Sequence, residues 1–220
     1  MLTIWGRRNS TNVQKVAWAI GELQLEYQRR DVGGSFGGLN TAEFVALNPN
    51  SMIPVLQDGD VTVWESHAIV RYLAEKYGNG TLCPADVAAR ARSDMWMDWM
   101  HTTFSPSFFD VFLGLIRTPS SNVDHDKVRD AAMQLGDVWG VLDKQLRDSP
   151  YVAGDELTIG DIPLGVACYR YFNMAIERPP LANIEAWFKR LQSRTAYQQH
   201  VMIPFGGNFE EFIALEREPD

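Results

Sequence analysis

Short apolar runs and stretches with helical spacing alternate through the first eighty residues. Residues 2–5 form an apolar run that predicts a strand. Helix-capping side chains cluster at residues 9–12, and the apolar residues after them recur three and four positions apart, as on one face of a helix. These apolar positions are Val13, Val16, Ala17 and Ile20. A second strand is predicted over residues 26–32.

The spacing of apolar residues changes several more times before residue 80, so further short elements are expected. The pattern predicts a glycine-rich loop at 33–38, a short helix at 41–47, strands at 54–57 and 61–64, and a helix from Ser66 to a glycine cap at Gly78. Asp58-Gly59, between the last two strands, supplies the positive φ of a tight hairpin turn. This order of elements is typical of a small mixed sheet with helices on its faces.

Strand signals disappear after residue 79. Residues 87–116 are rich in apolar side chains and broken at Ser105-Pro106, which implies a kink or a new helix. Further helices are indicated by apolar spacing over 128–146, by a capping box at Thr158–Asp161, and by apolar residues at 184–191. The pattern leaves the structure of 203–213 open. The expected fold class is α/β plus all-α, with an α/β domain at 1–79, a linker at 80–86 and an all-helical domain at 87–220.

Composition and charge mainly exclude functions. The chain has 20 Lys and Arg against 28 Asp and Glu, a net charge of −8, which argues against a nucleic-acid partner and an anionic membrane surface. No run of about 18 residues lacks charged side chains, so we expect no membrane span. Cys83 and Cys168 fit neither a zinc motif nor a disulfide framework, and the four histidines are scattered, so we expect no metal. With no secretory signal pattern, the chain is expected to be cytoplasmic.

Four segments, in this order, resemble the serine-type cytosolic glutathione transferases. They are the turn at residues 10–16, the loop at 48–56 that enters a proline, the Trp64-Glu65-Ser66 triplet, and the glycine turn and capping box at 152–161. The resemblance spans the whole chain. It implies a thioredoxin-like N-terminal domain of order βαβαββα, an all-helical C-terminal domain, glutathione as cosubstrate and a homodimer. Its class within the family, theta-, beta- or nu-like, stays open.

Ser10 lies where a predicted strand ends and a helix begins, a place where unpaired N–H groups and the helix dipole favour an anion. Spacing alone also explains Ser10 and Asn12 as helix caps. The resemblance implies instead that the Ser10 hydroxyl donates to the sulfur of bound glutathione and that the Asn12 amide is a second donor. The nucleophile then belongs to the cosubstrate, and the protein only stabilises its thiolate.

The other motifs imply glutathione-binding positions. The Ser66 N–H and hydroxyl suit the γ-glutamyl carboxylate, and Glu65 suits the ammonium group beside it; a plain capping pair is the alternative. Base rates favour a trans Ile53-Pro54 bond, but the resemblance implies cis, with the Ile53 backbone pairing to the cysteinyl residue like an added strand.

One position departs from the family pattern. Many relatives carry a basic residue just before this proline loop, whereas this chain has Met52, which offers neither a charge nor a strong donor. Asn40 is a possible substitute donor. We therefore expect weaker glutathione binding than in relatives with a lysine there.

An apolar set in the helical half is the candidate for the second substrate. Met100, Phe104, Phe108 and Phe112 recur at four-residue spacing, and Phe209 lies near the end of the chain. In family terms these positions line a pocket for a hydrophobic electrophile, and ordinary helix core is the alternative. Arg117 either steers an anionic substrate or is solvated.

Three functions therefore remain open. The leading one is conjugation of the glutathione thiolate to an electrophilic carbon. The second is glutathione-dependent disulfide reduction without a protein cysteine, which Asn12 keeps open. The third is a non-catalytic binding protein of the same fold, which Met52 favours.

Overall fold

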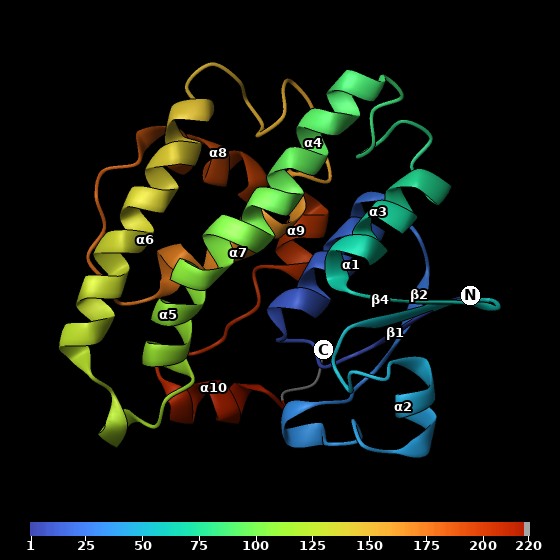
Figure 1. Ribbon diagram of the computed structural model, residues 1–220, viewed down its shortest axis with the longest axis horizontal. Coiled ribbons are helices and arrows are strands. Elements are labelled where there is room, and N and C mark those ends of the chain that lie inside the picture. Colours follow the sequence, from blue (N-terminus) through green and yellow to red (C-terminus); the bar gives the residue numbers. More distant parts are fainter. Residues whose placement is uncertain (218–220) are drawn as a thin grey trace.

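A four-stranded mixed sheet organises the first part of the computed structural model, which describes residues 1–217 (Figure 1). Its strands are β1 (Leu2–Trp5), β2 (Tyr27–Arg30), β3 (Val55–Asp58) and β4 (Val61–Trp64). The spatial order is β2-β1-β3-β4, with β1 parallel to β2 and the other two pairs antiparallel. The predicted strands are thus confirmed, and β2 is shorter than the predicted range.

The helices of this part are α1 (Thr11–Glu22), the 3₁₀ turn η1 (Gly34–Phe36), α2 (Ala42–Leu47) and α3 (Ser66–Tyr77). Helices α1 and α3 pack together on one face of the sheet (Figure 1). The predicted apolar face of α1 forms a buried cluster there with Leu2 and Ile4 of β1. Because side chains alternate across a strand, Trp5 points to the other face, where it packs against Phe44 of α2.

Two glycines bear on the predicted turns. Gly59 follows β3 with φ 60°, as the hairpin prediction requires. Gly78 is the C-cap of α3, as predicted, and its backbone is right-handed, with φ −76°. Glycine is needed at this place because a Cβ would overlap the carbonyl oxygens of Ala74 and Thr81.

Helices make up the second part of the chain. They are α4 (Val87–Trp99), the π-helix η2 (Met100–Phe104), α5 (Ser105–Ile116), the 3₁₀ turn η3 (Ser120–Asn122), α6 (His125–Gln145), α7 (Asp161–Asn173), α8 (Ala182–Gln192), α9 (Thr195–His200) and α10 (Phe209–Leu215). The predicted break at Ser105-Pro106 takes the form of the π-helical turn just before it. Proline has no N–H to continue an α-helical ladder, and Ser105 Oγ donates to the Met100 carbonyl at 2.7 Å.

Asp161 confirms the predicted start of α7. Its buried carboxylate accepts bonds from the backbone N–H of Thr158 and of Val152, at 2.9 and 3.0 Å, and from Trp187 Nε1 at 3.0 Å. Burial raises the pKa of Asp161 to about 6, against the opposing effect of these bonds. The capping segment therefore also ties α7 to α8.

Helix α1 lies between the sheet and the helical part, where it contacts α7 and α9 (Figure 1). The expected linker, residues 80–86, falls between α3 and α4, and the Leu82 carbonyl accepts a bond from Ile159 N–H at 2.9 Å. The expected helical domain begins where α4 does, and its last three residues lie outside the described ones. Within residues 1–217, every helix is too short or too polar to cross a membrane.

Candidate functional site

Ser10 stands at the N-cap of α1 with its hydroxyl unused by the helix. Its backbone is extended, with φ −72° and ψ 125°, and its side chain makes no capping hydrogen bond. The capping alternative for Ser10 is therefore not what the structure shows. The Ser10 hydroxyl therefore does not serve as a helix cap. It lies beside the unpaired N–H groups of a helix start, a place that favours an anion.

A cavity of about 510 Å³ opens beside the first turns of α1 and α3. It brings together three predicted site residues, Asn12, Glu65 and Ser66. The rest of the lining comes from both parts of the chain: Lys15, His67, Ala68, Arg71, Asp98, His101, Ser105, Pro106 and Phe109. The sequence analysis missed these nine residues. Lys15 could have been found from Asn12, because residues three apart share a helix face.

Asn12 lies inside a polar cluster. Its Oδ1 is 2.9 Å from Lys15 Nζ and 3.4 Å from Ser66 Oγ. Burial lowers the pKa of Lys15 to about 7, although the nearby Glu65 carboxylate opposes this. Lys15 Nζ is also 3.1 Å from His67 Nε2, and burial together with Lys15 lowers the pKa of His67 to about 2. His67 is therefore neutral in the working pH range.

Glu65 has an unusual backbone. Its φ is 71°, in the left-handed region that residues with a Cβ rarely occupy. Its side chain is exposed and does not cap α3, while Ser66 is buried as the first residue of that helix. Left-handed non-glycine residues gather at binding sites, so this conformation marks the start of α3 as a candidate ligand contact.

The loop before β3 carries the other predicted contacts. The Ile53-Pro54 bond is cis, which confirms what the resemblance implied. Met52 is 64% exposed, and its carbonyl accepts a bond from Asn48 Nδ2 at 2.8 Å. Asn40 is exposed as well. The 510 Å³ cavity is lined by none of the predicted contacts Asn40, Met52, Ile53 and Pro54, so the roles of these four residues stay predictions.

The predicted electrophile residues lie mainly in the helical core. Met100, Phe104, Phe108 and Phe112 are buried, and Phe209 is half-buried at the start of α10. Phe104 meets Trp139 edge to face, with ring centroids 4.6 Å apart. As placed, the four buried residues fit the core alternative, and the cavity lining comes from a neighbouring helix face with Pro106 and Phe109.

A buried arginine supports the turn that carries Ser10. Arg170 of α7 donates from Nη2 to the Asn9 carbonyl at 2.6 Å and to Gln14 Oε1 at 3.0 Å. Burial lowers its pKa to about 9, and its guanidinium lies 5.0 Å from the centre of the Phe112 ring. The helical part thus holds the turn before α1 in place.

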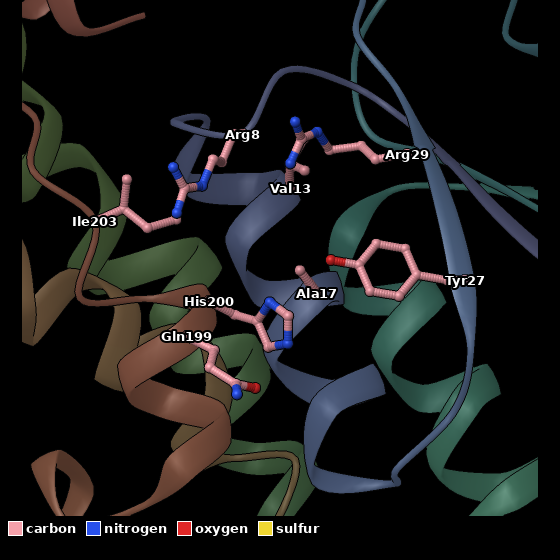
Figure 2. Close-up of a pocket in the computed structure, with 8 residues that line it drawn as sticks. All are labelled: Arg8, Val13, Ala17, Tyr27, Arg29, Gln199, His200 and Ile203. Carbon is pink, nitrogen blue, oxygen red and sulfur yellow. The ribbon is translucent and has the colours of Figure 1, made fainter. Parts of the chain in front are cut away.

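A second cavity, of about 220 Å³, lies between α1, β2 and α9 (Figure 2). Figure 2 shows the side chains of Arg8, Arg29, Tyr27 and His200 around it. It uses a different face of α1, and no predicted site residue lines it. We therefore assign the candidate site to the larger cavity.

Both cysteines lie away from the candidate site. Cys83 and Cys168 do not line the 510 Å³ cavity, and burial raises the pKa of the Cys168 thiol. In the described part of the chain, no three His, Cys, Asp or Glu side chains are grouped to hold a metal ion. The polar groups that line this cavity are hydroxyl, amide, amine, imidazole, guanidinium and carboxylate groups.

Comparison with known proteins agrees with both halves of the fold. Residues 1–75 match the model of the glutathione S-transferase N-terminal domain, and residues 93–195 match that of the C-terminal domain. Glutathione S-transferase GstB of Escherichia coli is 38% identical over 206 residues, 93% of this chain and 99% of that protein. Glutathione S-transferase 3 of Zea mays is 32% identical, over 91% of this chain and 93% of that protein.

A solved structure is also similar over the full length. The theta class glutathione S-transferase from the citrus canker pathogen Xanthomonas axonopodis pv. citri, with glutathione bound, aligns with a TM-score of 0.90 and 46% identity. The alignment covers 93% of this chain and 99% of that one. The architecture is that of a thioredoxin-like domain joined to a helical domain. The chain belongs to the glutathione S-transferase family and is an enzyme of that family.

Proposed function

We propose that this transferase adds the glutathione thiolate to a hydrophobic electrophile, with the sulfur held at the N-terminus of α1. The observation that carries the proposal is the convergence of Asn12, Glu65 and Ser66 on one cavity. Ser10 does not itself line that cavity, but it precedes Asn12 by two residues at the N-cap of α1, and its hydroxyl makes no capping bond to the helix. The similar Xanthomonas transferase was solved with glutathione bound, which supports glutathione as the ligand here.

The two ends of glutathione fit different parts of the site. The γ-glutamyl carboxylate accepts bonds from the Ser66 N–H and hydroxyl at the start of α3, and Glu65 faces its ammonium group. The Ile53 backbone, beside the cis proline, pairs with the cysteinyl residue as an added strand would. This places the thiol near Ser10 and Asn12.

The energetics are sufficient for thiolate formation. A cysteine thiol has a pKa of about 8.5, and lowering it by about two pH units needs about 2.7 kcal/mol of preferential thiolate stabilisation. One hydrogen bond to a charged acceptor contributes about 1.5–3 kcal/mol, and the helix terminus adds about 0.3–1 kcal/mol. Ser10 at the start of α1 therefore accounts for the shift, and Asn12 adds to it.

The reaction then needs no covalent intermediate with the protein. The thiol proton leaves to solvent, the thiolate forms a bond to the electrophilic carbon, and a leaving group such as halide departs with its electron pair. The electrophile approaches along the helical wall of the cavity, where Pro106 and Phe109 supply apolar surface. We also propose a homodimer, which sedimentation analysis tests.

A second function is favoured by one observation. Asn12 lines the cavity while both cysteines lie elsewhere, so disulfide reduction by glutathione without a protein thiol is compatible with the site. Parallel assays with an aryl halide and with hydroxyethyl disulfide separate the two reactions. Faster turnover of the disulfide would favour the reductase.

The deciding experiment is Ser10→Ala. We expect the variant to fold normally and to raise the pKa of the bound glutathione thiol by about one to two pH units, because one charge-assisted bond is lost. Ultraviolet titration of the thiolate in the complex measures this shift. Ser121→Ala, at an exposed serine of η3, is the matched control. A titration curve unchanged by Ser10→Ala rejects Ser10 as the donor.

A further inference from the structure

The side-chain amide of Asn12 is held by its oxygen. Lys15 Nζ lies 2.9 Å from Oδ1 and Ser66 Oγ lies 3.4 Å from it, and both groups donate. An amide whose oxygen accepts both bonds presents its NH₂ end elsewhere. Because Asn12 lines the cavity, that NH₂ end is the part of the side chain available to a ligand.

Lys15 is in turn fixed from the helical part. Its Nζ is 3.1 Å from His67 Nε2, and His67 also makes a hydrogen bond to the backbone of Met97 in α4. A neutral imidazole has one donor and one acceptor nitrogen. Since Nε2 faces the amine, it accepts from Lys15, and Nδ1 donates to the Met97 carbonyl. A chain of bonds therefore runs from α4 through His67 and Lys15 to Asn12.

The burial of Lys15 has no evident structural purpose. Lys15 is only 6% exposed, and its buried neighbours on α1 are the apolar Val13 and Val16 and the uncharged Gln14. Burying an amine costs free energy unless its bonds are recovered. Here Lys15 Nζ makes its hydrogen bonds to Asn12 and His67. Both the charged and the neutral amine have N–H groups that can donate these bonds. The arrangement is thus kept over the physiological pH range.

We propose that Lys15 is a positioning residue that fixes the Asn12 amide so that its NH₂ group donates to the sulfur of bound glutathione. This inference rests on the proposed function and deepens it, because it explains how Asn12, the proposed second donor, is oriented. Ser10 and Asn12 then approach the thiolate from the same helix start. Lys15 itself does not touch the sulfur.

The first test is Lys15→Met, which keeps most of the apolar stem and removes the donor. We expect the pKa of the bound thiol to rise by about one pH unit, a roughly tenfold change in its ionisation equilibrium. The transition in the pH profile of kcat is expected to shift to higher pH by the same amount. The loss of kcat is then large at neutral pH and disappears in alkaline solution, while KM for glutathione changes less. A purely structural defect would lower kcat at every pH. Lys127→Met, at an exposed lysine of α6, is the control.

A double-mutant cycle tests whether Lys15 acts through Asn12. On an Asn12→Ala background, Lys15→Met is expected to move the thiol pKa no further. Asn12→Asp is a second variant that keeps both accepted bonds and removes the NH₂ group, so it is expected to raise the thiol pKa on its own. It also serves if Lys15→Met folds poorly.

Each result has a definite meaning. An unchanged titration curve in Lys15→Met or in Asn12→Asp overturns the inference, as does an equal shift on the Asn12→Ala background. If the native enzyme itself fails to lower the thiol pKa of glutathione, the proposed function falls and this inference falls with it. If the native enzyme lowers the thiol pKa of glutathione and Lys15→Met lowers it equally, the inference about Lys15 is wrong and the proposed function stands.

Discussion

Arg194 and Glu22 form a two-pronged ion pair across the boundary between the two parts of the chain. Arg194 Nε lies 2.8 Å from Glu22 Oε1, and Nη2 lies 2.7 Å from Oε2. The Glu22 side chain is 8% exposed and also accepts a bond from Trp18 Nε1 at 2.8 Å. An acidic residue at the C-terminal end of α1 is unfavourable to the helix dipole, so this carboxylate depends on the arginine.

The first prediction concerns that pair. Arg194→Ala is expected to lower the free energy of unfolding by about 1–3 kcal/mol, because a largely buried carboxylate loses its cation. The partial exposure of the arginine keeps the loss below that of a fully buried pair. Urea unfolding measures it. Arg147→Ala breaks a fully exposed surface pair with Asp148, which solvent screens, so its free energy of unfolding is expected to change much less. Equal losses in the two variants would contradict the prediction.

The second prediction uses two neighbouring phenylalanines of α5. Phe108 is 1% exposed in the core, and Phe109 is 36% exposed and lines the cavity. Phe108→Ala is expected to destabilise the fold by about 3–5 kcal/mol. Phe109→Ala is expected to leave stability nearly unchanged and to lower kcat/KM for aromatic electrophiles several-fold. Thermal unfolding and steady-state kinetics on both variants check this, and the reverse pattern would return the electrophile to the core-facing residues.

The third prediction concerns the missing cation at Met52. Met52→Lys is expected to tighten glutathione binding by about two- to fivefold, the size of one exposed ion pair with the glycyl carboxylate. Calorimetric titration measures the affinity. Met133→Lys, at a similarly exposed methionine of α6, adds the same charge far from the loop. If both variants bind glutathione equally tightly, the gain comes from net charge and not from position 52.

The fourth prediction is a pH dependence of stability. The folded pKa of Lys15, about 7, lies below the ordinary value of 10.5, so between these values the unfolded chain binds more protons. The contribution of Lys15 to stability therefore rises with pH across this window, by about 1.4 kcal/mol per pH unit. The free energy of unfolding of the native protein minus that of Lys15→Met is expected to follow this slope in urea titrations at several pH values. A difference that stays constant would place the Lys15 pKa near its ordinary value.

The spacing of apolar residues predicts most of the fold, because apolar side chains recur where an element faces the core. The apolar run of β1 and the apolar stripe of α1 both follow from packing against one shared core. Apolar spacing does not predict helix α10. Its start does carry a sequence signal, because Asn208 and Glu211 form a capping pair, with Glu211 N–H donating to Asn208 Oδ1 at 2.9 Å.

The residues of the helical part that line the 510 Å³ cavity could not be predicted in the same way. Hydrophobic spacing selected positions 100, 104, 108 and 112, which face the core. On this side the cavity is lined by positions 98, 101, 105, 106 and 109, and three of these, 101, 105 and 109, each follow a core-facing position by one residue. One residue turns a helix by about 100°, and a cleft face mixes polar and apolar side chains, so burial patterns do not mark it.

The contact between Arg170 and the Asn9 carbonyl has a consequence for how activity is lost. The Arg170 guanidinium, from the helical half of the chain, holds the Asn9 carbonyl one residue before Ser10, the proposed thiolate donor. A perturbation that shifts α7 is therefore expected to displace this turn and to lower turnover, even where the sheet is undisturbed. Enzyme assays on this protein then report on the packing of both halves at once.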